Sequence, residues 1–164
     1  MAGTALMAAL STILLLLGTF IPVNTLFFTA MAAYFIGYSI NKYGLKYGGI
    51  QLAACVLLDL FLNPNKIHWG LYLCFGSYIF LSEVIFLKWN HIGEGKKKLR
   101  VQLLFNWILF NGIDIPVLIF FQNLLPDWNL PGGIAVFWVL GQIGWIIYDK
   151  AYRAFIGILQ ERGT

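Results

Sequence analysis

Carboxylate and amide side chains interrupt the apolar runs of this sequence at positions where a binding site could form. Asp59 lies near the end of one run, and Asn111 and Asp114 lie three residues apart in another. A three-residue spacing places two side chains on the same face of a helix. A charged group inside a bilayer costs at least about 2.5 kcal/mol, so it needs a partner, a wet cavity or a place near the interface. Groups of this kind can orient a polar solute by hydrogen bonds.

A short polar segment follows Asp59. Asn63, Lys66 and His68 lie within nine residues of it. One interpretation is a polar rim around a bound solute, formed where these side chains meet outside the hydrocarbon. The other is a local pair of Asp59 with Lys66 that stabilises the loop.

Two further segments have both a functional and a structural interpretation. Asn111 and Asp114 precede Pro116, which tends to kink a helix and to free a backbone carbonyl, so they could form part of a ligand site. They could instead hydrogen-bond between helices to Gln142. The segment 127–129 combines a carboxylate, a flat aromatic ring and an amide, which suits a heteroaromatic ligand, although Trp128 also suits an interfacial anchor.

The motifs of known enzyme and metal chemistry are missing from the sequence. It has no nucleophile elbow, no H-E-x-x-H, no paired metal-ligand motif and no glycine-rich phosphate loop. Cys55 and Cys74 are isolated within apolar runs, which is typical of small buried residues and not of a disulfide, zinc or haem site. We therefore expect a protein that is not an enzyme and that has no cofactor and no bound metal.

The elements that carry these residues are predicted to be membrane helices. Of the 164 residues, 60% are hydrophobic and 11% are charged, which is too apolar for a soluble domain of this size. Six apolar runs are separated by polar or turn-forming segments, at about 4–20, 25–40, 45–62, 69–88, 101–124 and 132–159. We predict an all-α membrane protein with six transmembrane helices in a single domain, 1–164.

The basic residues predict the orientation of these helices. Ten of the eleven Lys and Arg residues lie in three stretches that follow every second run, at 42–46, 88–100 and 150–162, and Lys66 is the exception. Positively charged loops stay in the cytoplasm, so both termini are expected inside. Topology thus explains the net charge of +4 without a nucleic-acid partner. The basic cluster at 96–100 could also contact anionic membrane lipid.

Two carboxylates fall near the cytoplasmic side of this topology and are predicted to be structural. Glu83 lies in the inner part of the fourth run and Asp149 lies beside Lys150. Lys88 or Lys150 can extend its charge to the headgroups while a nearby carboxylate offsets it.

Small residues mark two helix faces for close packing. Ala2, Ala5, Ala9 and Thr12 share a face of the first predicted helix, and Thr29, Ala33 and Gly37 share one of the second. Small residues let helices approach closely in lipid. The first face could contact a partner protein or pack inside this one.

The opening of the chain resembles a known family. The segments 5–11, 21–22 and 35–38 are similar to the start of the substrate-binding membrane subunits (S components) of energy-coupling-factor vitamin transporters. The similarity continues more weakly through the third run and Leu62-Asn63-Pro64-Asn65-Lys66 into the fourth, where the chain looks more like uncharacterised bacterial membrane proteins related to S components. The last two runs match only in topology.

This resemblance implies an S-component-like bundle in the bacterial plasma membrane. Such a subunit captures a small-molecule solute from outside and docks on a transmembrane coupling subunit driven by two ATPases. The family's docking motif, a pair of small residues on the first helix, matches Ala5 and Ala9. The solute-binding residues expected on the external side are Asp59, Asn63, Lys66, His68, Asn111, Asp114, Asp127 and Trp128.

A membrane scaffold is the alternative prediction. A bacterial rod-shape-determining membrane protein of similar size also has six helices and S-component-like architecture, and it needs no ligand. A pure scaffold has little reason to gather polar residues toward one side of the membrane.

Overall fold

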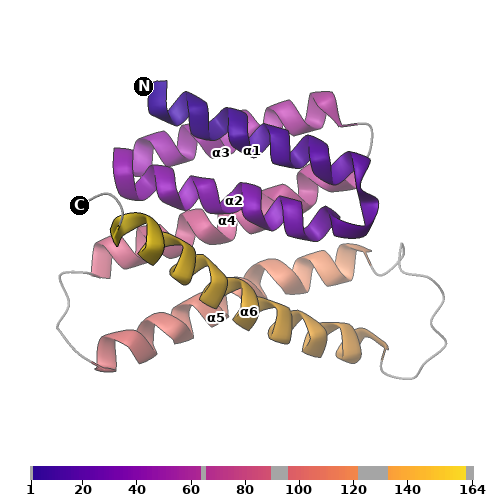
Figure 1. Ribbon diagram of the computed structural model, residues 1–164. Helices are drawn as coiled ribbons and strands as arrows, with labels where there is room; N and C mark the ends of the chain where they lie inside the picture. Colours follow the sequence, from indigo (N-terminus) through magenta and orange to yellow (C-terminus); the bar gives the residue numbers. More distant parts are fainter. Residues whose placement is uncertain (1, 64–65, 90–95, 122–132, 162–164) are drawn as a thin grey trace. The chain divides into compact units, whose positions relative to one another are not determined.

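The computed structural model describes residues 2–63, 66–89, 96–121 and 133–161, and all regular structure in these ranges is helical. The helices are α1 (Ala2–Phe20), the short 3-10 helix η1 (Pro22–Asn24), α2 (Thr25–Tyr43), α3 (Leu45–Leu62), α4 (Lys66–Trp89), α5 (Lys96–Phe121) and α6 (Gly133–Glu161) (Figure 1). The prediction of an all-α fold with six long helices is confirmed for the described residues.

Four of these helices are long and apolar enough to cross a membrane. The qualifying segments are Ala2–Phe20 in α1, Leu45–Leu62 in α3, His68–Lys88 in α4 and Val101–Ile119 in α5. They indicate a membrane protein. Helices α2 and α6 are not among the four, so six spans and the inside location of both termini stay predictions.

The position of α2 in its bundle accounts for its greater polarity. It contacts α1, α3 and α4, so much of its surface faces protein. Thr29, Ala33 and Gly37 are all buried, as predicted for a packing face of small residues. The Thr29 hydroxyl donates to the carbonyl of Thr25 at 2.8 Å. A helix enclosed by other helices can carry such groups because they are bonded within the protein.

The chain divides into two compact units, residues 1–92 with α1 to α4 and residues 93–164 with α5 and α6. In the first unit, α2 and α3 each contact all three other helices, and in the second, α5 contacts α6. That the two units form one domain over 1–164 stays a prediction.

The turn between α2 and α3 depends on glycine. Gly44 has a φ of +96°, a region that disfavours residues with a Cβ, and its N–H donates to the carbonyl of Ile40 at 2.9 Å. One turn into α3, Gly48 is buried against α2, and a Cβ there would meet the Ile40 side chain and come within 3.4 Å of the Ile36 carbonyl oxygen. The tight turn and the close approach together hold α2 against α3.

Two predicted helix boundaries are wrong. Residues 96–100 were expected in the cytoplasmic loop but form the first turn of α5. Lysine, leucine and arginine are good helix formers, so the helix extends beyond its apolar run. Helix α4 likewise begins at Lys66 and not at Trp69. Helix α5 continues through Pro116 to Phe121, within the predicted fifth run.

Gly48→Ala is expected to destabilise the first unit by about 1–3 kcal/mol, because the added methyl group overpacks the contact between α2 and α3. Gly70→Ala is the matched control, since a Cβ at Gly70 in α4 meets nothing within 4 Å. Thermal unfolding of the two variants in detergent measures the difference. Equal melting temperatures would contradict the close approach at Gly48.

Candidate functional site

Polar side chains follow one buried face of α3 at intervals of four residues. They are Gln51, Cys55, Asp59 and the first residue beyond the helix, Asn63, and none is more than 2% exposed. At 1.5 Å per residue the twelve-residue separation of the first and last corresponds to about 18 Å, more than half of a hydrocarbon core of about 30 Å. The inward face of α3 is therefore polar over most of its length.

Three of the predicted solute-binding residues lie together where α3 ends and α4 begins. The Asn63 amide donates to Thr19 Oγ1 at 2.7 Å and to Asp59 Oδ1 at 3.2 Å. His68 is only 4% exposed and is close enough to Asp59 to interact with it electrostatically. A Cβ on Gly18 of α1 would lie 3.2 Å from His68 Cε1, so the imidazole packs against α1.

The burial of Asp59 and His68 differs from the exposed polar rim expected from the sequence. Asn63 explains part of the difference, because its amide satisfies one carboxylate oxygen and allows Asp59 to be buried. Lys66 is the first residue of α4, and its side chain lies outside the described residues, as do Asp127 and Trp128. The predicted pair of Asp59 with Lys66 therefore stays a prediction.

Further polar groups continue the arrangement along the bundle. The Gln51 amide donates to the Ser11 hydroxyl at 3.2 Å, and Ser11 donates to the carbonyl of Ala32 at 3.1 Å. Tyr72 of α4 is fully buried, with its hydroxyl close to Ser11 and Cys55. We call the set the interhelical polar cluster, which consists of Ser11, Gln51, Cys55, Asp59, Asn63, His68 and Tyr72.

Sequence reasoning missed four members of this cluster as polar contacts: Ser11, Gln51, Tyr72 and the thiol of Cys55. The thiol of Cys55, interpreted only as a small buried residue, donates to the carbonyl of Ala8 at 3.6 Å. The four-residue spacing along α3 was visible in the sequence. The spacing alone could not show whether this face of α3 meets α1 and α4 or the lipid.

In the second unit, Asn111 takes part in bonding between helices. Its amide donates to the carbonyl of Trp107 at 2.9 Å. Its Oδ1 accepts from the Trp138 indole at 3.0 Å and from the Gln142 amide at 3.1 Å. Trp107 in turn donates to Gln142 Oε1 at 2.9 Å. Hydrogen bonding between helices is the structural alternative considered for Asn111. Its side-chain amide and carbonyl groups are therefore already bonded within the protein.

Unlike Asn111, Asp114 has a side-chain oxygen that no described residue bonds. It is half-buried, and its Oδ2 has no hydrogen-bond partner among the described residues. A Cβ on Gly141 of α6 would lie 3.4 Å from that oxygen, so the carboxylate faces the α6 backbone where the residue is smallest. Asp114 therefore keeps an acceptor for a further group.

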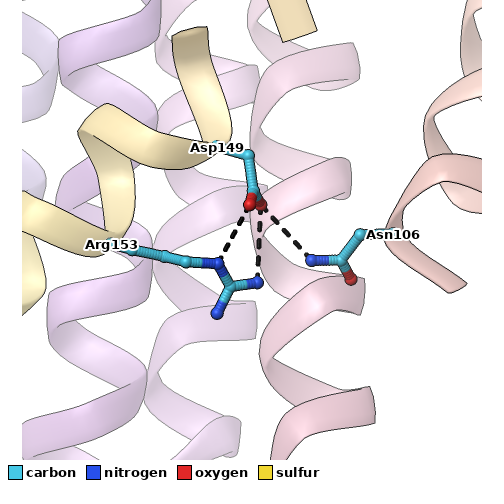
Figure 2. Close-up of polar contacts among 3 residues, drawn as sticks. All are labelled: Asn106, Asp149 and Arg153. Carbon is cyan, nitrogen blue, oxygen red and sulfur yellow. Dashed lines mark hydrogen bonds and ion pairs between the residues drawn. The ribbon is translucent and has the colours of Figure 1, made fainter. Parts of the chain in front are cut away.

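The two carboxylates predicted to be structural are both bonded. Glu83 Oε2 accepts from the Asn41 amide at 3.1 Å. Figure 2 shows Asp149 between Arg153, whose Nε lies 2.9 Å from Oδ2, and Asn106, whose amide donates to Oδ1 at 3.3 Å. Arg153 lies four residues beyond Asp149 and thus on the same helix face, a pairing that was not considered from the sequence. The suggested charge compensation between Asp149 and Lys150 stays a prediction.

The small-residue face of α1 opens on a groove. Ala5 and Ala9 are exposed, and with Ala8, Thr12, Gln51 and Ala54 they line a groove of about 720 Å³ between α1 and α3. Ala5 and Ala9 are therefore not covered by the other helices of the first unit, and whether this face meets a partner or packs inside the protein stays a prediction. Inside the second unit, Leu103, Trp107, Trp145 and Ile146 help line a groove of about 560 Å³. Neither groove is lined by a predicted solute-binding residue.

The fold and these contacts define an all-helical protein with four membrane-capable helices and a polar cluster inside its four-helix unit. Within the described ranges, no group of three or more His, Cys, Asp or Glu residues could hold a metal ion. No family model matches the chain, and neither a curated protein nor a solved structure is significantly similar to it.

The hydrogen bond of Asn63 with Thr19 can be tested by a double-mutant cycle. Asn63→Ala is expected to destabilise the protein by about 1–3 kcal/mol, because it also leaves Asp59 unsatisfied. Thr19→Val keeps the side-chain shape. The double variant should lose less stability than the sum of the single variants, by about 0.5 kcal/mol or more, since both remove the same bond. Additive changes in the unfolding free energy would contradict the contact.

Proposed function

We propose that this chain is the solute-binding membrane subunit of an energy-coupling-factor type uptake transporter. It crosses the bacterial plasma membrane six times with both termini in the cytoplasm, binds a small molecule from the external side, and docks through α1 on a transmembrane coupling subunit. The two ATPases of the complex supply the energy, so this chain itself is not an enzyme. The resemblance of its first two helices to S components supports this proposal.

The groove beside Ala5 and Ala9 is the observation that carries the proposal. Two buried polar residues in its wall, Thr4 and Gln51, have side-chain oxygens without a hydrogen-bond partner among the described residues. Exposed small residues allow close helix approach, and the groove offers an apolar concave surface. A transmembrane helix of the coupling subunit supplies the complementary shape.

Within the first unit, solute binding is assigned to the end that carries Asp59, Asn63 and His68. Within the second unit, Asp114 is the proposed solute-binding carboxylate. Lys66, Asp127 and Trp128 belong to the same proposed external side. Asn111 positions Trp138 and Gln142 and contributes less directly, since its amide and carbonyl are already bonded.

A membrane scaffold of rod-shape-determining type is the second candidate. The two grooves favour it, because both are lined mainly by apolar residues and neither includes a predicted solute-binding residue. Native mass spectrometry of the gently purified protein separates the two functions. A co-purified small molecule supports the transporter subunit, whereas a reproducibly empty protein that retains partner proteins supports the scaffold.

Docking through α1 is tested by Ala5→Trp and Ala9→Trp. Each large side chain fills the groove and should reduce co-purification with a co-expressed coupling subunit by about tenfold or more, since steric overlap easily exceeds 1.4 kcal/mol. Leu6→Trp is the control, because Leu6 is exposed on α1 outside the groove. Unchanged co-purification of the alanine variants would show that this face does not dock.

Asp114 is tested by uptake of the solute that co-purifies with the protein. Asp114→Ala should lower uptake by about tenfold or more, because losing a hydrogen bond to a charged group weakens binding by about 1.5–3 kcal/mol. Ile115→Ala, an exposed neighbour, should leave uptake unchanged. Uptake equal to that of the unaltered protein would remove Asp114 from the site.

A further inference from the structure

Asp59 is a buried carboxylate whose charge is not balanced within the described part of the chain. Its Oδ1 accepts from Asn63, but its Oδ2 has no partner, and no described lysine or arginine forms an ion pair with it. By comparison, Asp149 pairs with Arg153 and Glu83 accepts from Asn41. A carboxylate in an apolar, membrane-spanning helix is unfavourable unless a proton or a cation neutralises it, a hydrogen-bond donor satisfies it or it lies near the interface.

Two more polar atoms without a well-formed hydrogen bond to a described residue belong to the same region. His68 Nδ1 has no hydrogen-bond partner among the described residues. The Tyr72 hydroxyl lies close to Ser11 and Cys55, but it makes no hydrogen bond of good geometry with a described residue. His68 and Tyr72 lie four apart on α4 and thus share a helix face, and both interact electrostatically with Asp59 on α3. Neither is more than 4% exposed. Unpaired buried polar atoms are rare in folded proteins, so three that converge from two helices indicate a missing partner.

The chemistry of these atoms specifies the missing partner. A carboxylate oxygen only accepts hydrogen bonds, an imidazole with its proton on Nε2 presents Nδ1 as an acceptor, and a phenol oxygen also accepts. We propose that Asp59, His68 and Tyr72 form the recognition site for a small solute that presents a protonated nitrogen. The ammonium-type group supplies a positive charge, which no described lysine or arginine provides to Asp59, and N–H donors for the three acceptors. This inference rests on the proposed solute-binding function and names its substrate class.

The described charges disfavour an anionic solute at this site. Among the described residues, the interhelical polar cluster contains no lysine or arginine, and a carboxylate or phosphate group would be repelled by Asp59. Exclusion of water strengthens the attraction between Asp59 and a cation, because the effective dielectric constant falls away from the solvent. The Asn63 amide, which donates to Asp59 and Thr19, holds the carboxylate in place.

The full chain, purified in detergent, is titrated with ethylammonium and imidazolium chloride. Sodium propionate and uncharged propionamide serve as controls at matched ionic strength, and tryptophan fluorescence reports thermal unfolding. At least one cation should raise the melting temperature saturably, by about 3 °C or more at ten times its apparent Kd. Propionate and propionamide should have no saturable effect. Absence of saturable stabilisation by either cation would overturn the proposal.

Asp59→Asn keeps the shape of the side chain and removes its charge. It should weaken binding of the stabilising cation by about 30-fold or more, as expected for the loss of one partner of a buried charge pair. Glu83→Gln is the matched control, since it neutralises another buried carboxylate of the same unit that is bonded to Asn41. The apparent Kd of the Glu83→Gln variant for the stabilising cation should stay within about twofold of that of the unaltered protein.

A measurement on the unaltered protein covers the case in which Asp59→Asn does not fold. Dicyclohexylcarbodiimide modifies carboxyl groups in membranes, and mass spectrometry locates the product. The stabilising cation should slow modification of Asp59 and leave that of Glu83 unchanged. Equal rates at Asp59 with and without the cation would contradict binding there.

The outcomes also separate this inference from the proposed function. If propionamide binds and Asp59→Asn leaves its affinity unchanged, the protonated-nitrogen assignment is wrong while solute binding stands. If acidification alone stabilises the protein and no cation does, the cluster holds only a proton, which also overturns the assignment. Loss of docking in Ala5→Trp leaves all these measurements unaffected, because they use the isolated chain.

Discussion

The internal satisfaction of polar groups within apolar helices is the constraint on which this structure depends. Water is not available in a bilayer to bond a side chain that enters it, so each such group needs a partner from the protein. The hydrogen bonds from Asn63 to Thr19 and from Gln51 to Ser11 meet this need between α1 and α3, and the bond from Asn63 to Asp59 does so at the end of α3. These contacts also determine which faces of the helices meet.

The two units meet the constraint differently. In the first, helices pack closely at small residues such as Gly48, and the polar groups lie inside the bundle. In the second, Asn111 and Gln142 join α5 to α6 through amide and indole bonds that stay partly exposed. The first unit thus encloses its polar residues, whereas the second presents some of them on its surface.

Some of the exceptions to this constraint lie where function is inferred. Atoms of Asp59, His68 and Tyr72 that lack a hydrogen bond of good geometry lie inside the bundle, where a small cationic group could satisfy them. Thr4 and Gln51, whose side-chain oxygens are also unpaired, form part of the wall of the groove beside Ala5 and Ala9, where a helix of another protein could pack. One physical argument therefore supports both a solute site and a docking surface, and it assigns them different residues.

The sequence by itself determined the helices, because a run of about 20 apolar residues has few other stable states in lipid. It also identified Asp59, Asn63 and His68 as neighbours, since they lie within nine residues of one another in the sequence. Only the tertiary structure decided that Asp59 and His68 are buried, that Asn111 is used between helices and that Arg153 holds Asp149. The physical reason is that residue spacing shows which side chains share a helix face, whereas the packing of neighbouring helices decides what that face meets.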